Sequence, residues 1–339
     1  MQPFRPPVLL RNPHLQSILA STGPRKPLAR LRARRLRSVA RTELLACSDG
    51  VRLAGQYSAQ SGPSKGLAIL LHGWEGCAES LYLLSAGSRL FASGYDVFRL
   101  NLRDHGPTHH LNRELFNSTR LQEVIDAVRL VQQHHASARN FLVGFSLGGN
   151  FALRIAARAP AAGIGLDQVV AVCPVLNPRK TMDALETGWW VYHRYFVRKW
   201  QRSLRRKLEH FPELGYGDEL LKLKTLRAMN GYFVPRYTEF PDTRSYLDGY
   251  SLLGDTLRDL QVPVQLITSR DDPMILAEDL AALPRNNALT IELTEHGGHC
   301  GFIENWRLQS WVDRRILALC DAARGHDSPS PAARRPLRR

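Results

Sequence analysis

From residue 43 onward, short apolar runs rich in β-branched residues alternate with longer segments of helical periodicity. Strands that are apolar on both faces and joined by helices belong in a mostly parallel sheet that helices cover on both sides. We therefore expect an α/β fold. The predicted strands are 66–71, 95–100, 140–144, 168–173, 263–268 and 289–293.

The same periodicity predicts the connecting elements. One helix is expected to begin near Ser118, a second directly after Ser146, and a last one to contain Trp306 and Trp311. Before the parallel strands, the turn sequence SDG at 48–50 predicts an antiparallel hairpin over 43–58.

One interval breaks the alternation. Between about residues 178 and 258 no buried strand run occurs, and aromatic and basic residues are frequent. We interpret this interval as a helical insertion that forms a lid over the carboxyl edge of the sheet. The expected organisation is a basic N-terminal arm (1–42), one α/β domain (43–323) that contains the lid, and a disordered basic tail (324–339).

The charge is concentrated at the two ends of the chain. Lys and Arg number 46 against 31 Asp and Glu, for a net charge of +15, and residues 1–42 hold ten bases and no acid. A nucleic-acid-binding face usually combines basic with aromatic side chains, but residues 25–41 contain no aromatic. Nucleic acid is therefore a poor candidate partner. A solvated arm that contacts anionic lipid or the domain's own surface fits better.

The five cysteines favour a reducing, cytoplasmic compartment. Their number is odd, no C-x-x-C spacing occurs, and each is expected to be a small buried hydrophobe. No run of 18 apolar residues predicts a membrane span, and Arg5 and Arg11 interrupt the start of the chain where a signal peptide would need an apolar region.

The sequence GFSLG at 144–148 follows a predicted strand and precedes a predicted helix. Such a turn projects a serine hydroxyl above the sheet, beside a helix N-terminus, and needs glycine where the backbones approach closely. We predict Ser146 as a nucleophile. The alternative is an ordinary glycine-rich turn.

A serine hydroxyl needs a histidine base, and that histidine needs an acid to fix its tautomer. Asp271 and Asp272 follow a predicted strand, and we prefer Asp272, with Asp271 as the alternative. His299, in a glycine-rich loop after the last strand, is preferred as the base over His296. Neither histidine has an accompanying carboxylate cluster or H-E-x-x-H spacing, so no metal site is expected.

The segment HGWEG at 72–76 follows another predicted strand. A turn of this kind supplies one backbone N–H to an oxyanion hole, and the residue after the nucleophile supplies the other. We therefore predict the amides of Trp74 and Leu147 as the oxyanion donors.

These motifs together resemble the YheT-like branch of the α/β-hydrolases, the AB hydrolase 4 family. The matching segments are RNPHLQ (11–16), HGxEG (72–76), GFSLGGN (144–150), DDP (271–273) and GGHxGF (297–302). The resemblance implies an α/β-hydrolase fold, a Ser146, Asp272 and His299 triad, no cofactor, and carboxylesterase or acylglycerol lipase activity. A thioesterase, an amidase and a non-catalytic lipid-binding protein of the same fold are the alternatives.

Two segments depart from the pattern of that family. RDHGPTHH at 103–110 replaces a cysteine- and glycine-rich segment, and Leu276 replaces a proline. The first departure lies at the active edge and bears on substrate range. We expect four histidines to lie on the surface: His109, His110, His134 and His135.

The lid contains a strongly aromatic stretch from Trp189 to Leu208, in which seven basic residues and no acid fall between 194 and 207. An apolar stripe bordered by Lys and Arg is typical of a helix that lies in a membrane surface. The other interpretation is that the stripe packs over the sheet with its charges in solvent. On the membrane-surface interpretation, the protein is cytoplasmic and also makes peripheral contact with the inner membrane surface.

Overall fold

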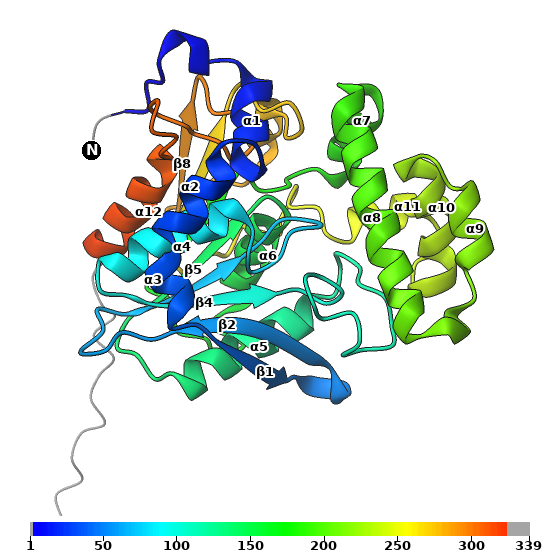
Figure 1. Cartoon of the computed structure of the whole chain (residues 1–339), viewed down its shortest axis with the longest axis horizontal. Helices are drawn as coiled ribbons and strands as arrows, with labels where there is room; N and C mark the ends of the chain where they lie inside the picture. Colours follow the sequence, from blue (N-terminus) through cyan, green and yellow to red (C-terminus); the bar gives the residue numbers. More distant parts are fainter. Residues whose placement is uncertain (1–2, 324–339) are drawn as a thin grey trace, which may run out of the picture.

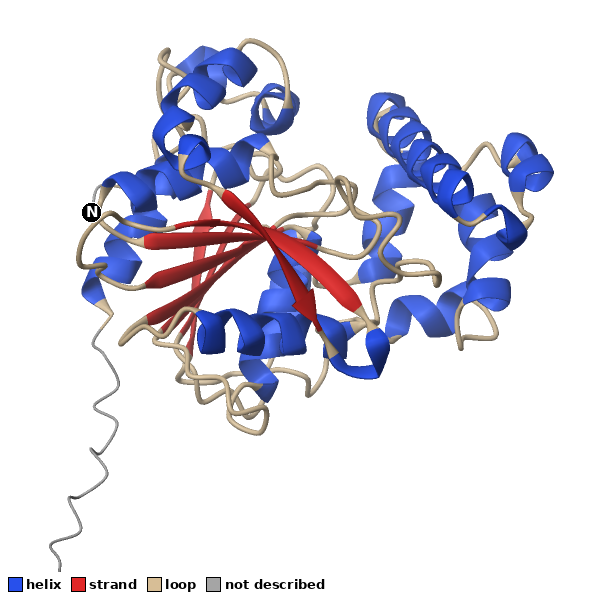
Figure 2. Cartoon of the chain, turned by 60° about the horizontal axis from the view of Figure 1, so that its bottom comes forward, coloured by secondary structure: helices blue, strands red, loops and turns tan. Residues whose placement is uncertain are grey.

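The computed structural model describes residues 3–323, which form one twisted eight-stranded sheet with helices on both faces (Figures 1 and 2). The strand order is β1-β2-β4-β3-β5-β6-β7-β8. β1, β2 and β4 pair antiparallel, and the pairs from β4 through β8 are parallel. The carboxyl ends of the parallel strands therefore share one edge, where functional groups of such sheets collect.

The predicted strands are confirmed to within a residue or two, and so is the hairpin. The strands are β1 (Arg41–Ala46), β2 (Arg52–Ser58), β3 (Leu67–Leu71), β4 (Asp96–Asn101), β5 (Asn140–Phe145), β6 (Gln168–Val172), β7 (Val264–Ser269) and β8 (Leu289–Thr294).

The sheet separates two apolar cores, and β3 contributes to both. Leu67, Ile69 and Leu71 belong to one core, while Ala68 and Leu70 belong to the other, and all five are fully buried. Because successive side chains of a strand point to opposite faces, a central strand between two helical layers must be apolar throughout. The uninterrupted apolar run follows from this position.

The helices form the two layers. α5 (Leu121–His134) and α6 (Leu147–Arg158) supply the first core. α4 (Leu81–Ala92) and α12 (Trp311–Ala322) pack against each other over the second core. The predicted helix containing Trp311 is confirmed, but Trp306 lies outside it, in the preceding loop, and is 63% exposed.

The N-terminal segment is folded, in contrast to the solvated arm expected for 1–42. It forms α1 (Pro13–Ser21), α2 (Arg25–Arg32) and α3 (Arg34–Ser38), which pack on α4 (Figure 1). Ala20, Ala33 and Leu36 join the second core. Even Arg25 is buried, where it donates to Ser85 Oγ at 3.0 Å. The ten basic residues of the segment suggested a solvated arm and hid its apolar face. The predicted tail, 324–339, lies outside the described residues.

The insertion between β6 and β7 is entirely helical and stands beside the sheet (Figure 2). Its helices are α7 (Pro178–Thr187), α8 (Trp190–His210), α9 (Gly217–Lys222), α10 (Leu226–Tyr237) and α11 (Thr243–Asp248). We call residues 178–258 the lid. In the part of the chain described, 3–323, no helix has the length and apolar character needed to cross a membrane.

Candidate active site

Ser146 stands at the turn between β5 and α6. Its backbone has φ 56° and ψ −119°, a left-handed conformation that is strained for a residue with a Cβ. The turn raises the side chain above the carboxyl end of the sheet, at the first turn of α6. This is the geometry that the sequence predicts for a nucleophile.

The two glycines of this segment are required by close backbone approaches. A Cβ on Gly144 would lie 2.1 Å from the carbonyl oxygen of Gly148, and a Cβ on Gly148 would lie 2.4 Å from that of Leu71. Both distances are far inside van der Waals contact, so neither position accepts a side chain. The G-x-S-x-G spacing is therefore a packing requirement of β5, α6 and the neighbouring β3.

His299 joins Ser146 to Asp272 through both nitrogens of its ring. Nε2 lies 2.9 Å from Ser146 Oγ, and Nδ1 lies 2.8 Å from Asp272 Oδ2. With its proton on Nδ1, donated to the carboxylate, the imidazole can accept the serine proton at Nε2. The structure thus brings together the three side chains predicted as a triad, from the ends of three different strands.

The two neighbouring aspartates hold different parts of the histidine loop. Asp272 reaches the imidazole, and its other oxygen accepts the amides of Met274 and Ile275 at 2.9 and 3.0 Å. Asp271 instead accepts the amide of Gly298 at 2.9 Å. The structure therefore places Asp272, and not the alternative Asp271, in hydrogen-bond contact with His299. His296 lies 3.5 Å from Asp271, outside the triad.

The electrostatics of His299 suit a base that becomes charged during a reaction. Burial is the largest single influence and disfavours protonation, but the Asp272 carboxylate and the Cys300 side chain together outweigh it and raise the pKa of His299 well above its ordinary value. The imidazolium is therefore stabilised where it would form. The same shift means that the imidazole must first lose its proton to act as a base, so we expect activity to rise with pH.

Helix α1 braces the loop that carries His299. Ser17 Oγ accepts the His299 amide at 2.8 Å, and the Gln16 side chain bonds both the amide and the carbonyl of Ile303, at 2.6 and 3.1 Å. A Cβ on Gly298 would lie 2.3 Å from a backbone oxygen of α1. Gln16 and Ser17 are thus positioning residues that sequence reasoning missed. Gln16 is the last residue of the RNPHLQ motif, which only the family resemblance made visible, and Ser17 follows it directly.

The predicted oxyanion donors lie beside Ser146. A Cβ on Gly73 would be 3.0 Å from the Cβ of Ser146, so the HG turn touches the nucleophile. Leu147 is the first residue of α6, where an amide has no partner within the helix. Among the hydrogen bonds of residues 3–323, none uses the amide of Trp74. Both amides are therefore free to bind a developing oxyanion.

Strained backbone collects at this edge of the sheet. Six non-glycine residues with positive φ lie in the loops around the triad, and they are Glu75, Asp104, Ser146, Cys173, Cys300 and Phe302. Such conformations persist where surrounding contacts hold them, which is typical of functional sites.

A cavity of about 570 Å³ opens above Ser146 and His299. Its volume is in the range of small-molecule sites. The cavity lies between the sheet edge, α1, α2 and the lid, and its wall is mainly apolar, with Leu81, Phe196 and Trp200 among the lining residues. This composition suits an acyl chain.

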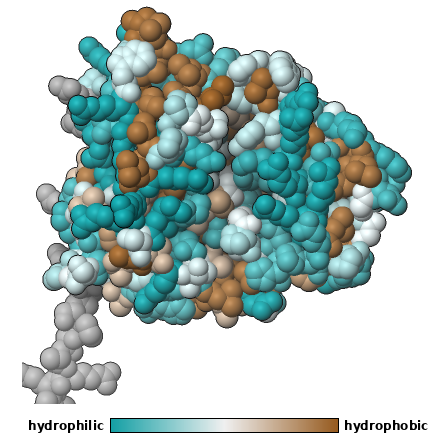
Figure 3. All heavy atoms as spheres, in the orientation of Figure 1, coloured by the Kyte–Doolittle hydropathy of each residue, from teal (hydrophilic) through white to brown (hydrophobic). Residues whose placement is uncertain are grey.

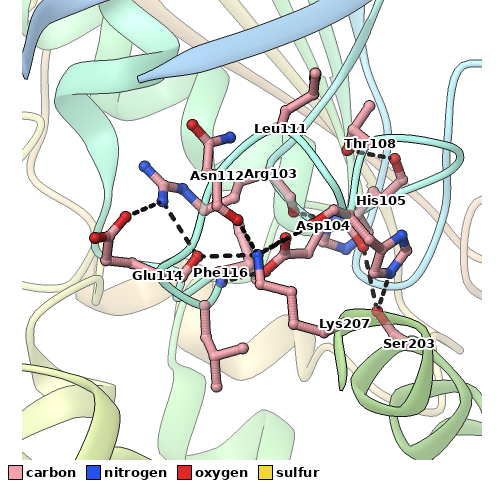
Figure 4. A network of polar contacts seen from close by, with 12 residues as sticks. Arg103, Asp104, His105, Thr108, Leu111, Asn112, Glu114, Phe116, Ser203 and Lys207 are labelled. Carbon is pink, nitrogen blue, oxygen red and sulfur yellow. Dashed lines mark hydrogen bonds and ion pairs between the residues drawn. The ribbon is translucent and has the colours of Figure 1, made fainter. Parts of the chain in front are cut away.

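Lys207 of the lid clamps α8 to the loop after β4 (Figure 4). Its ammonium is buried, donates to Asp104 Oδ1 at 2.7 Å, and contacts the carbonyls of His109, Asn112 and Glu114. Burial raises the pKa of Asp104 and lowers that of Lys207, and each charge opposes the shift of the other. We call Asp104, Lys207 and these carbonyls the clamp.

The clamp corrects one prediction about the histidines. His109 is buried, not on the surface, and its Nε2 lies 2.8 Å from Ser203 Oγ of α8. Burial lowers its pKa to about 3, so the ring stays neutral. His110 and His134 are exposed as predicted, and His135 is partly buried against Glu43. The segment 103–110 that departs from the family pattern is the segment that receives the lid.

The aromatic stripe of α8 faces the molecule. Tyr192, Val197 and Leu204 are buried, and Trp74 stacks on Phe196 with ring centroids 5.3 Å apart. The packing interpretation of the stripe is therefore correct for most of its length. The opposite face is cationic, and its exposed members are Arg194, Arg198, Arg202, Arg205 and Arg206. Trp189, Trp190 and Tyr195 remain exposed at the start of the helix.

One group within residues 3–323 has the composition of a soft metal site. Donor atoms of Cys173, His299 and Cys300 all lie within 4.8 Å of one another. Both ring nitrogens of His299 are already bonded within the triad, however. An ion held by these three residues would have to displace Ser146 or Asp272.

A serine, a histidine and an aspartate that are joined by hydrogen bonds at the carboxyl edge of a mixed sheet are the arrangement typical of an α/β-hydrolase. Residues 68–308 match the sequence model of the alpha/beta hydrolase family, so the chain belongs to that family. Within it, the chain is YheT-like. It is 25% identical over 317 residues to the Escherichia coli (strain K12) protein named "Putative esterase YheT", covering 90% of this chain and 89% of that protein.

Two further relatives extend this comparison. Human "Phospholipase ABHD3" is 22% identical over 84% of this chain and 73% of its own length. Among solved structures, the Pyrococcus furiosus esterase PF2001 superimposes with a TM-score of 0.57 at 16% identity, covering 84% of this chain and 91% of that one. The structural likeness supports the fold.

Proposed function

We propose that the protein is a serine hydrolase of carboxylic esters. The observation that carries the proposal is the unbroken chain from Ser146 Oγ through His299 to Asp272, with contacts of 2.9 and 2.8 Å, beneath an apolar cavity. The names of the relatives, an esterase and a phospholipase, support the same reaction class.

The mechanism follows from the geometry. Ser146 attacks the ester carbonyl carbon while His299 Nε2 takes its proton, and the amides of Trp74 and Leu147 bind the developing oxyanion. His299 then protonates the leaving alcohol, and the C–O ester bond breaks to leave an acyl-serine. Water, deprotonated by His299, releases the acid by the same route. Asp272 stabilises the imidazolium in both steps. The residues need no cofactor.

A panel of p-nitrophenyl esters from acetate to palmitate, assayed beside Ser146→Ala, tests the proposal. Turnover by the wild type that the variant lacks supports it, and the preferred chain length reports the depth of the cavity. Matched thioester and anilide substrates test the alternative acyl groups. Absence of turnover on every substrate, with fatty acid still bound, would instead favour a non-catalytic lipid-binding protein.

We also propose peripheral contact between the lid and an anionic membrane surface, which would place this cytoplasmic enzyme at the inner membrane face. The five exposed arginines of α8 form no ion pair among residues 3–323. Hydrophilic side chains lie on both sides of the hollow between the N-terminal helices and the lid (Figure 3). The same helix lines the apolar cavity through Tyr195 and Phe196, and a cationic helix face of this kind suits anionic headgroups. Cosedimentation with vesicles tests this contact.

A further inference from the structure

Two cysteines lie beside the triad, and the proposed mechanism uses neither. Cys173 follows β6 at the carboxyl edge of the sheet, and Cys300 follows His299 directly in its loop. The two sulfur atoms and a ring nitrogen of His299 all lie within 4.8 Å of one another. Both cysteines have positive φ, 44° and 60°, which is a conformation that surrounding contacts must hold in place. Two segments far apart in the chain thus bring a pair of thiols to the base.

The Cys173 thiol holds the loop on both sides of His299. Its Sγ donates to the carbonyl of Gly298 at 3.8 Å and accepts the amide of Cys300 at 3.4 Å. The first of these contacts needs the thiol proton, because a sulfur without hydrogen can only accept. The position of the loop therefore depends on the oxidation state of Cys173.

The two thiols differ in reactivity. Burial raises the pKa of Cys173 well above its ordinary value, so this side chain stays protonated. Burial also opposes ionisation of Cys300, but the hydrogen bond with Cys173 and the charge of His299 outweigh it and lower the pKa of Cys300. The thiolate is the form of cysteine that attacks an oxidant. Cys300 is therefore the reactive member, and Cys173 is the second thiol.

Cys300 can also be reached from outside. It lines the cavity of about 570 Å³ above the triad, so a small oxidant that enters the cavity meets its sulfur. Cys47 and Cys320 are not among the lining residues, and burial raises the pKa of each to about 12. Cys77 lines the same cavity and serves below as a matched control.

We propose that Cys173 and Cys300 are an oxidation site at which a peroxide forms a disulfide and switches the triad off. The Cys300 thiolate attacks one oxygen of hydrogen peroxide, the O–O bond breaks, and hydroxide leaves a sulfenic acid behind. The sulfur of Cys173 then bonds to that of Cys300, and the thiol proton leaves with the displaced hydroxide as water. The two sulfurs lose two electrons, and the peroxide becomes water and hydroxide. A small dithiol reverses the bond by exchange.

The disulfide would disturb the base. It removes the thiol proton that holds the loop and ties Cys300, the neighbour of His299, to the end of β6. The loop cannot move as a whole, since a Cβ on Gly301 would lie 2.5 Å from a backbone oxygen of α1. We therefore expect His299 Nε2 to lose its 2.9 Å contact with Ser146 Oγ.

The test treats the full chain with hydrogen peroxide and then with dithiothreitol. The intact mass of the wild type should fall by two hydrogens, and peptide mapping should link residues 173 and 300. Turnover of a p-nitrophenyl ester should fall about 100-fold, as for a misplaced catalytic group, and return with dithiothreitol.

Three variants, each compared with its own untreated sample, sharpen the test. Cys300→Ser should resist peroxide. Cys173→Ser lacks the second thiol, so Cys300 should gain one or two oxygens instead, and the form with two should not recover in dithiothreitol. Cys77→Ser should respond as the wild type does. The link in the wild type is measured without any variant, so an unstable variant does not affect that result.

Several outcomes would overturn the inference. An unchanged mass after peroxide would mean that the pair does not oxidise, and a link with unchanged turnover would mean that it is no switch. Equal inactivation of the wild type and Cys300→Ser would place the sensitive residue elsewhere.

The effect on turnover rests on the proposed ester hydrolysis, whereas the bond itself does not. A link between residues 173 and 300 in a protein that hydrolyses no ester would support the oxidation site and contradict the proposed function alone. An active esterase that forms no link would overturn the oxidation site alone.

Discussion

Two polar constellations lie at the carboxyl edge of the same sheet and are built in opposite ways. In the triad, Ser146 and His299 meet through one contact and face an open cavity. In the clamp, the Lys207 ammonium is enclosed by a carboxylate and three carbonyls, and Asp104 also accepts the Phe116 amide at 2.8 Å. The triad leaves hydrogen-bonding groups accessible to a substrate, whereas the groups of the clamp are all bonded to one another. We infer that the triad serves chemistry and that the clamp serves stability.

Glu75, in the turn after β3, lies between these extremes. Its amide donates to His105 Nε2 and its carbonyl accepts from Lys199 Nζ, so its backbone is held like the clamp, while the residue lines the cavity like the triad. If the contrast is correct, changes in the triad should lower activity without loss of stability, and changes in the clamp should do the reverse. Changes at Glu75 should affect both.

The largest expected effect is on the triad acid. Asp272→Asn keeps the shape of the side chain but favours the wrong tautomer of His299, which lowered kcat about 10⁴-fold in a serine protease. Asp271→Asn, which keeps an oxygen for the Gly298 amide and loses only the charge that faces His296, should cost far less. Steady-state kinetics on one short ester would rank the two. The opposite ranking would place the acid one residue earlier.

The next effect is on the clamp. Lys207→Met leaves Asp104 buried without its cation, and breaking a buried pair in this way costs about 3–5 kcal/mol of unfolding free energy. Urea unfolding measures it. Arg202→Met, an exposed change on the same helix, should stay within about 0.5 kcal/mol. Adding Asp104→Asn to Lys207→Met should recover part of the loss. A stable single variant with low activity would assign the clamp to catalysis.

Glu75→Gln should be stabilising above neutral pH. The pKa of Glu75 is raised by burial to about 7 in the folded protein against an ordinary value of 4.5, so its charge costs nothing below about pH 4.5. The cost grows as pH rises and is complete above about pH 7, at up to roughly 3 kcal/mol. Melting curves of wild type and Glu75→Gln should therefore coincide at pH 4 and separate by pH 8. A difference in melting temperature between the two proteins that does not change with pH would mean that the carboxyl is solvated.

The smallest effect is expected on the arginine-bearing face of α8, for which we propose contact with lipid. Each exposed arginine near an anionic surface contributes about 1 kcal/mol, so Arg198→Ala should weaken binding to phosphatidylserine vesicles about 5-fold. Binding should also fall steeply with added salt and be absent on neutral vesicles. Lack of binding at low salt would limit α8 to covering the active site.

The elements that sequence predicted well are those with local signals. A few neighbouring residues are enough to predict the strands and the turns at GFSLG, DDP and GGH. A buried strand or a tight turn restricts residue type locally. The structure then brought Ser146, Asp272 and His299 together as predicted.

The elements that the sequence did not predict depend on contacts between residues far apart in the chain. Lys207 looks like any basic residue of an amphipathic helix, and its burial follows from Asp104, 103 positions earlier. The brace of Gln16 on Ile303 spans 287 positions. The N-terminal segment appeared to be a solvated arm because its ten basic residues conceal the apolar residues that pack, among them Leu19 and Leu36. No periodicity encodes such pairings.

The nucleophilic role of Ser146 is the central claim, and labelling with a fluorophosphonate tests it most directly. Intact-mass spectrometry should find one added phosphonyl group on the wild type, none on Ser146→Ala, and slower labelling of Asp272→Asn at equal stability. Equal labelling of the wild type and Ser146→Ala would contradict the account, since the reactive hydroxyl would then lie elsewhere.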